Sequence, residues 1–171
     1  AGAAAGAALA AGLQPASSAE GLGAVRAIRG RGAVYRGRFS VVDEAYNASP
    51  AAVRAALEML AAMPAAGRRI AVLGDMLELG EKAEAYHREA GRLAAVSADA
   101  LVAVGSFAPA LVSGAREGGM KGAALGVSRA EEGLETILGA GLADDGDIVL
   151  VKGSRAVKME IIVSGLVEML G

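Results

Sequence analysis

The sequence contains no cysteine and few aromatic residues, and both absences narrow what the protein can do. Without cysteine there are no disulfides, no thiolate metal ligands and no cysteine nucleophile, which suits a reducing compartment. We therefore expect a cytoplasmic protein. Aromatic residues are 3% of the 171 residues, and 17 basic residues are balanced by 19 acidic ones, so we expect no nucleic-acid surface.

Common site motifs are also missing. Neither GxxxxGK[ST] nor a GxGxxG that follows a strand occurs, despite 25 glycines, so the two usual phosphate-binding loops are absent. The GxSxG of serine hydrolases is missing, and His87 is the only histidine, which argues against a zinc site. We therefore expect neither catalytic residues nor metal ligands within this chain.

No hydrophobic run near the start is long enough to span a bilayer. Residues 1–11 are alanine-rich, lack a basic segment, and predict a small-residue helix packed against another helix. A second short helix is expected at about 17–25. Because the chain opens inside a helix and lacks an initiator methionine, we expect it to be a fragment of a longer protein.

A regular alternation of strands and helices follows a Gly/Arg-rich segment at 26–38, which we interpret as a hinge. Ser49 and Pro50 suit the start of the first helix. The strands are short apolar runs, as in sheets covered on both faces. The expected strands are 39–43, 69–73, 100–104, 123–127 and 147–151, and the expected helices are 50–63, 82–96, 109–117, 129–138 and 157–170.

This pattern predicts an α/β fold: a Rossmann-like, doubly wound, mostly parallel sheet with helices on both faces, preceded by a short helical remnant. We expect residues 1–37 to form that remnant with the hinge, and residues 38–171 to form the sheet domain. In such sheets ligands bind at the carboxyl ends of the strands. Polar residues of this chain gather after three of the predicted strands.

The first polar segment, DEAYNASP at 43–50, offers carboxylates, an aromatic ring and an amide that could hold a ribose and a base. An ordinary polar turn explains it equally well. The second segment, GDMLELG at 74–80, could bind a cation or an ammonium group. Its acids also suit an ordinary loop before a helix N-terminus.

The third polar segment is KGSR at 152–155. Lys152 and Arg155 offer donors to a carboxylate or phosphate, and Gly153 permits close approach of the backbone. The predicted helix would point its free N–H groups at the same place. The alternative is a solvated loop in which Ser154 caps that helix.

Between residues 28 and 160 the sequences IRGR, VVDEAYNASP, RRIAVLGDMLELG, EAYHREAG and DIVLVKGSRAVKME occur in this order. Together they resemble the C-terminal part of the Mur ligases. Within that family they are most similar to the type that adds D-alanyl-D-alanine to UDP-N-acetylmuramoyl-tripeptide. The alanine-rich opening resembles the last helices of the family's central ATPase domain.

The resemblance implies an ATP-dependent peptide ligase of peptidoglycan precursor synthesis that forms an acyl phosphate. It implies partners, namely the UDP-muramoyl-tripeptide, D-alanyl-D-alanine and the missing domains of the same protein. ATP and Mg²⁺ are the implied cofactors, with the phosphate loop and the Mg²⁺ ligands upstream of residue 1. The fragment alone is expected to be inactive.

The resemblance also assigns residues. Those implied on the nucleotide side are Arg31, Asp43, Glu44, Tyr46 and Asn47. Those implied near the incoming substrate are Asp75, Glu78, Lys152, Ser154 and Arg155.

Two departures from the family pattern stand out. Ser49 replaces a common asparagine, and Ala156 replaces a common glycine. Two other interpretations of the sequence stay open: a sister amide ligase similar to folylpolyglutamate synthetase, and a non-catalytic Rossmann-like binding module.

Overall fold

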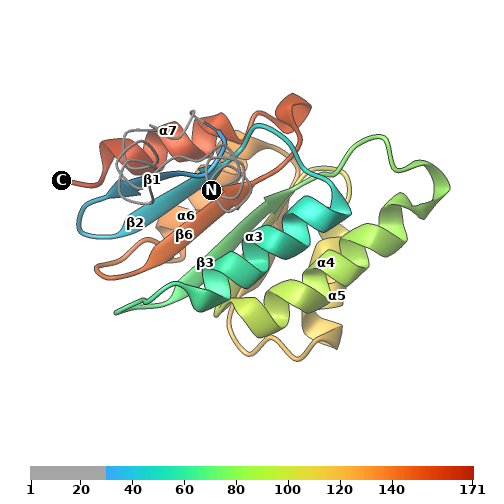
Figure 1. Cartoon of the computed structure of the whole chain (residues 1–171), viewed down its shortest axis with the longest axis horizontal. Coiled ribbons are helices and arrows are strands. Elements are labelled where there is room, and N and C mark those ends of the chain that lie inside the picture. Colours follow the sequence, from blue (N-terminus) through green and yellow to red (C-terminus); the bar gives the residue numbers. More distant parts are fainter. Residues whose placement is uncertain (1–29) are drawn as a thin grey trace, which may run out of the picture.

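A computed structural model describes residues 30–171, which form a six-stranded sheet with helices on both faces (Figure 1). The strand order is β1-β2-β6-β3-β4-β5, and every neighbouring pair is parallel except β1 with β2. The strands are β1 Ala33–Arg36, β2 Ser40–Glu44, β3 Arg69–Gly74, β4 Ala100–Val104, β5 Ala124–Val127 and β6 Ile148–Lys152. The helices are α3 Pro50–Ala62, α4 Ala83–Ser97, α5 Ala108–Glu117, α6 Ala130–Gly139 and α7 Glu160–Glu168, with 3₁₀ turns η1 Gly80–Lys82 and η2 Arg155–Val157.

The predicted fold class is confirmed, and so is the start of α3. The Ser49 hydroxyl accepts a hydrogen bond from the amide of Ala52 at 3.3 Å, and Pro50 takes the first helical position. That position suits proline because its missing N–H would have no partner inside the helix. Residues 49 and 50 therefore predicted the start of α3 from local interactions alone, without any tertiary contact.

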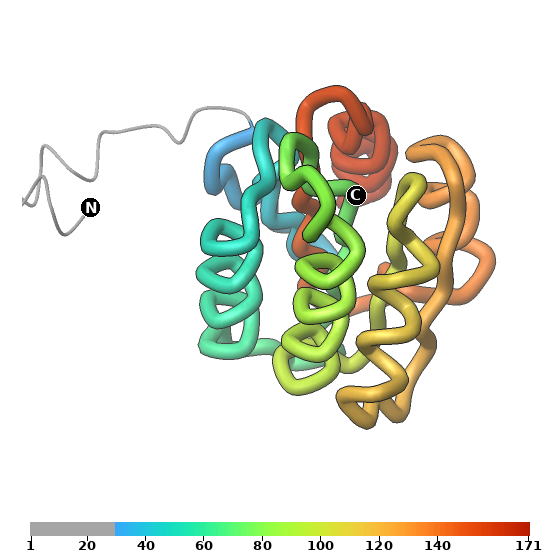
Figure 2. The backbone as a smooth tube through the Cα atoms, turned by 90° about the vertical axis from the view of Figure 1, so that its right-hand side faces the viewer, coloured from blue at the N-terminus to red at the C-terminus, as the bar shows by residue number. Residues whose placement is uncertain are grey.

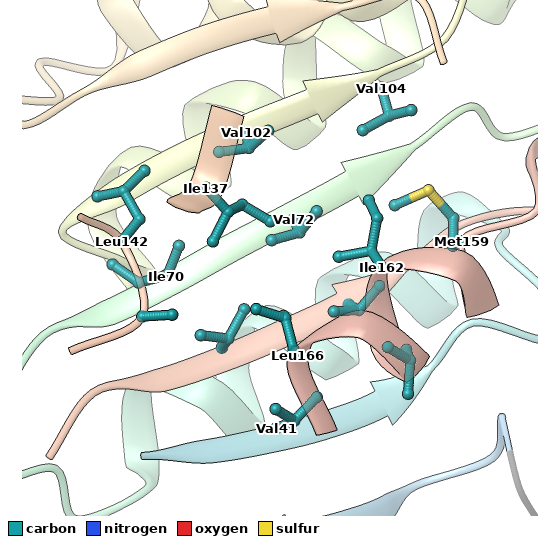
Figure 3. Packing of buried hydrophobic residues seen from close by; sticks show 14 of the residues in the cluster. Val41, Ile70, Val72, Val102, Val104, Ile137, Leu142, Met159, Ile162 and Leu166 are labelled. Atoms are coloured by element: carbon teal, nitrogen blue, oxygen red, sulfur yellow. The ribbon is translucent and has the colours of Figure 1, made fainter. Parts of the chain in front are cut away.

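The two faces of the sheet carry separate cores because successive side chains of a strand point to opposite sides. On one face, α6 and α7 cover Ile70, Val72 and Val102, and Figure 3 shows this packing. On the other face, α3, α4 and α5 lie side by side over Ala71 and Leu150 (Figure 2). The strands are buried on both sides, as their continuous apolar runs predicted.

Part of the segment predicted to be a hinge belongs to the sheet. Residues 33–36 form β1, which pairs antiparallel with β2 so that Ala33 lies opposite Asp43. The sheet therefore begins before residue 38, because the alternating AVYR run is long enough for an edge strand between glycine turns. The helices expected at 1–11 and 17–25 lie outside the described residues, and the division of the chain into a helical remnant and a sheet domain stays a prediction.

The last helix was predicted to begin at residue 157, and this start is wrong. A 3₁₀ turn, η2, follows β6, and Lys158 takes the left-handed conformation (φ 60°) before α7 begins at Glu160. A left-handed residue cannot continue an α-helix, so the free N–H groups of α7 do not converge on residues 152–155 as we expected.

The topology opens a crevice at the carboxyl edge between β2 and β6. The chain leaves β2 toward α3 on one face, whereas it leaves the neighbouring β6 toward α7 on the other face. Adjacent strands whose connections diverge in this way leave room for a ligand between them. None of the helices in residues 30–171 has the length and apolar character needed to cross a membrane.

Close packing of α4 on α5 gives a first prediction. A Cβ added at Gly91 would overlap the carbonyl oxygen of Leu111 and lie 2.8 Å from the Ala115 nitrogen. Gly91→Ala should lower the free energy of unfolding by about 1–3 kcal/mol, although alanine is the better helix former. Urea unfolding of the chain measures this.

The matched control is Gly139→Ala, at a helix end where an added Cβ meets nothing within 4 Å. This variant should be neutral or stabilised by about 0.4–1 kcal/mol. Equal stabilities of the two variants would show that α4 and α5 are less tightly packed than the structure indicates.

Candidate functional site

A pocket of about 330 Å³ lies in the crevice between the ends of β2 and β6. Its volume is at the lower end of the roughly 300–1,000 Å³ of small-molecule sites. The lining combines the end of β2 with the residues that follow β6. These residues are Gly30, Asp43, Ala45, Tyr46, Arg155 and Glu160.

Asp43 forms part of the pocket wall, but its carboxylate is already bonded inside the protein. One oxygen accepts from the amide of Gly30 at 2.8 Å and the other from the amide of Ala45 at 3.2 Å. Only 2% of the residue is exposed. Asp43 therefore ties residue 30 to the end of β2, which positions the segment that carries Arg31.

Glu44 and Lys152 form an ion pair across β2 and β6. The Lys152 ammonium lies 3.0 Å from the Glu44 carboxylate and also donates to the carbonyl oxygen of Asn47 at 3.0 Å. The lysine side chain is 3% exposed and the glutamate side chain 28%. A buried ammonium needs such a partner, so Lys152 holds the DEAYNASP loop against β6.

Asp75 joins the ends of three strands. Its carboxylate accepts from the amides of Ser106 and Phe107, which follow β4, at 2.8 and 3.0 Å. Its carbonyl oxygen accepts from the amide of Ser154, which follows β6, at 3.0 Å. The Ser154 hydroxyl in turn accepts from the amide of Leu77 at 3.1 Å. The carboxylate therefore holds the turn between β4 and α5, and Ser154 anchors the loop after β3.

Gly153 permits a close contact within the protein, where we had expected a close contact with a ligand. An added Cβ would lie 2.6 Å from the Met159 side chain and 3.1 Å from the Gly74 Cα. The expectation of ligand approach is therefore corrected: the glycine lets β6, β3 and the start of α7 meet.

His87 is a structural residue that sequence reasoning passed over as an ordinary packed or surface side chain. It is fully buried, and its Nε2 accepts from the amide of Met76 at 2.8 Å. Its Nδ1 lies 2.6 Å from the Ala83 carbonyl oxygen, so Nδ1 carries the proton. The ring stacks on Phe107 at 4.4 Å between centroids. His87 thus fixes the loop that contains Asp75.

Two arginines flank the ring of Tyr46 beside the pocket. The Arg31 guanidinium lies 4.2 Å from the ring centroid and the Arg155 guanidinium 5.5 Å. All three residues are exposed, and neither arginine forms an ion pair within residues 30–171. Hydrogen bonding from Arg31, followed by the charges of Arg31 and Arg155, lowers the pKa of the Tyr46 phenol. The arrangement favours an anion at this edge.

The structure thus sorts the predicted site residues into two groups. Arg31, Tyr46, Asn47 and Arg155 are exposed at the carboxyl edge, although the Asn47 Oδ1 accepts a hydrogen bond from the amide of Ala48 at 2.8 Å, so only its side-chain NH₂ group is open. Buried or internally bonded are Asp43, Glu44, Asp75, Lys152 and Ser154. Glu78 is exposed in the loop after β3 with a left-handed backbone (φ 63°), and it does not line the pocket.

Glu160 lines the pocket but was not among the predicted site residues. It follows KGSR by five positions, and the predicted helix start at residue 157 placed it inside a helix. The turn η2 and the left-handed Lys158 bring it to the pocket. The motif DIVLVKGSRAVKME ends on this residue. That position was the one feature of the sequence that could have marked Glu160 as a site residue.

Comparison with known proteins identifies similar chains. The sequence model of a family described as "Mur ligase, glutamate ligase domain" matches residues 30–155. The UDP-N-acetylmuramoyl-tripeptide--D-alanyl-D-alanine ligase of Bacillus subtilis is 32% identical over 162 residues, which cover 92% of this chain and 35% of that protein. The ligase of the same name from Escherichia coli is 38% identical over 136 residues, covering 75% and 27%. The chain spans roughly a third of these relatives.

Solved structures agree with the sequence matches. MurF from Acinetobacter baumannii superposes with a TM-score of 0.78 at 31% identity, covering 94% of this chain and 35% of that one. The MurF ligase from Thermotoga maritima in complex with ADP gives a TM-score of 0.69 at 29% identity, covering 86% and 32%.

The hydrogen bonds that Asp75 forms between the ends of three strands predict a loss of stability when it is substituted. Asp75→Ala leaves the amides of Ser106 and Phe107 without their acceptor, and should cost about 1.5–3 kcal/mol of unfolding free energy. Glu78→Gln, in the same loop but exposed, should change it by less than about 0.5 kcal/mol. Thermal or urea unfolding measures both, and equal stabilities would contradict the structural role of Asp75.

The arginines around Tyr46 predict a measurable titration. Positive neighbours stabilise the phenolate, so Tyr46 should ionise at a lower pH in the wild type than in Arg31→Ala. Arg155→Ala should raise the pKa of Tyr46 less, because Arg31 is the nearer and stronger donor. The observable is phenolate absorbance during alkaline titration, with Tyr46→Phe identifying the signal. Titration curves of Tyr46 that are the same in both arginine variants as in the wild type would contradict the proximity of the two arginines to its ring.

Proposed function

The chain belongs to the Mur ligase family, and we propose that it is the C-terminal domain of an ATP-dependent ligase that joins D-alanyl-D-alanine to UDP-N-acetylmuramoyl-tripeptide. The observation that carries this proposal is the match, over most of this chain, to ligases of that name from several bacteria. The exposed arginine pair at the carboxyl edge supports it, because every substrate of such a ligase carries negative charge. We further propose a cytoplasmic location, which the absence of cysteine suits.

Joining a carboxylate to an amine requires activation of the carboxylate. In the proposed reaction ATP supplies the phosphoryl group of an acyl phosphate, which the dipeptide amine attacks with release of phosphate. The role of this chain is to hold the charged reactants in position. Held in this way, they react as in a unimolecular step and no longer need to meet by diffusion. Cations fixed at the crevice stabilise the negative charge that gathers there.

Individual residues take distinct parts in this proposal. Arg31 faces the nucleotide phosphates, and the exposed ring of Tyr46 and the side-chain NH₂ group of Asn47 contact the nucleoside. Arg155 binds the carboxylate of the incoming dipeptide, for which its planar guanidinium is suited. Asp43, Glu44, Asp75, Lys152 and Ser154 serve by holding the loops that carry these groups. The role of Glu78 stays an expectation.

Magnesium does not fit the residues that the structure describes. Within residues 30–171 no three histidine, aspartate or glutamate side chains come together in a way that could hold a metal ion. We propose that Mg²⁺ is held by other domains of the parent protein, as is the phosphate loop.

Product formation by the full-length parent tests the proposal. With ATP, UDP-N-acetylmuramoyl-tripeptide and D-alanyl-D-alanine, sustained formation of ADP should require both other substrates, because the acyl phosphate turns over only when the dipeptide amine attacks it. The 171-residue chain alone should show no turnover, since it lacks a phosphate-binding loop. Two results would contradict the proposal: turnover by the isolated chain, or a parent that ligates glutamate to a folate and ignores the dipeptide.

Arg155 provides a residue-level prediction. In the full-length parent, Arg155→Ala should lower kcat/KM for D-alanyl-D-alanine roughly tenfold to a hundredfold, as expected for a lost charge-assisted contact. The melting temperature of the chain should barely change, because Arg155 is exposed and forms no ion pair within residues 30–171. Arg155→Lys should rescue little. Unchanged dipeptide kinetics would reduce Arg155 to a surface residue.

A further inference from the structure

The pocket contains a carboxylate that the proposed function leaves unused. We propose that Glu160 binds the ammonium group of the incoming dipeptide, while Arg155 binds its carboxylate at the other end. Both residues line the same pocket of about 330 Å³. The inference rests on the proposed function and adds a positioning residue and an orientation for the second substrate.

Glu160 is held in place by a buried neighbour. Met159, directly before it, is fully buried, and its side chain packs against Gly74 and Gly153 at the ends of β3 and β6. Because that side chain is anchored in the core, the backbone at Glu160 is fixed at the mouth of the crevice. The left-handed Lys158 makes the turn that returns the chain from Arg155 to this position.

The charge of Glu160 is open to a ligand. Among residues 30–171, the only other carboxylate in the pocket lining belongs to Asp43, which is 2% exposed and accepts hydrogen bonds from two backbone amides. Glu160 is exposed and forms no ion pair or side-chain hydrogen bond with the part of the chain that the structure describes. It also forms no ion pair with Arg155, so the pocket keeps two opposite charges apart.

Separated opposite charges suit a small molecule that carries both. D-alanyl-D-alanine has an ammonium group at one end and a carboxylate at the other. If Glu160 and Arg155 paired with each other, neither charge would be open to such a ligand. The cations near the pocket, Arg31 and Arg155, would repel an ammonium group elsewhere in the lining. Glu160 is therefore the favourable place for it, and the dipeptide lies with its carboxylate toward Arg155.

A purely structural role for Glu160 makes a different prediction. It is the first residue of α7, where an acid stabilises the positive end of the helix dipole. Loss of that effect would alter the stability of α7 and would not discriminate between substrates. The test therefore needs a readout that separates the dipeptide from ATP.

Steady-state kinetics of Glu160→Gln in the full-length parent provides that readout. The KM for D-alanyl-D-alanine should rise roughly tenfold, as expected for loss of a charge-assisted hydrogen bond, with the KM for ATP unchanged. Glu160→Asp should fall between the wild type and Glu160→Gln. Glu168→Gln, the same charge change at the exposed far end of α7, should match the wild type.

N-acetyl-D-alanyl-D-alanine, which lacks the ammonium charge, isolates the contact. As an inhibitor it should bind equally to the wild type and to Glu160→Gln. An active parent in which Glu160→Gln leaves the dipeptide KM unchanged, or raises both KM values together, overturns the inference alone. A wild-type parent without dipeptide-dependent turnover overturns the proposed function and the inference with it.

Discussion

The hydrogen bonds of Asp75 hold the carboxyl edge of this sheet together, and the candidate site depends on them. The Asp75 side chain holds the turn between β4 and α5 through two amides, while its backbone carbonyl accepts from the amide of Ser154, just after β6. His87 fixes the loop from the other side through the amide of Met76. Arg155 directly follows Ser154, so its direction is set by this joint between three strands.

The polar groups at this edge therefore fall into two classes: those bonded inside the protein and those exposed to a ligand. Within residues 30–171 every buried side-chain nitrogen or oxygen has a hydrogen-bond partner. The acids and the lysine at the strand ends are therefore mostly committed to the fold, as the pair of Lys152 with Glu44 illustrates. What remains for ligands is a small set at the rim: Arg31, Tyr46, Arg155, Glu160 and the side-chain NH₂ group of Asn47, whose oxygen is bonded to the Ala48 amide. Because buried hydrogen bonds hold the loops that carry them, these groups can meet a ligand without a rearrangement of the backbone.

Local signals made most of the fold predictable, whereas the site depended on distant contacts. Continuous apolar runs indicated buried parallel strands, and Ser49 with Pro50 marked a helix start. The strand β1 was not predicted because it lies inside the Gly/Arg-rich segment at 26–38, which we interpreted as a hinge. The pairing of Lys152 with Glu44 depends on the register of β2 against β6, more than a hundred positions apart. Likewise, no local pattern reveals that Arg31 and Arg155 both lie near the ring of Tyr46.

The most direct test of this account is a nuclear magnetic resonance titration of the chain with ADP, the nucleotide bound in the Thermotoga maritima structure. Chemical-shift changes are expected at Arg31, Tyr46 and Asn47. The side chains of Asp75 and Lys152, which are bonded inside the fold, should keep their hydrogen bonds. Changes centred on Asp75 and Lys152, with Arg31 and Tyr46 unaffected, would contradict the division between framework and ligand-facing groups.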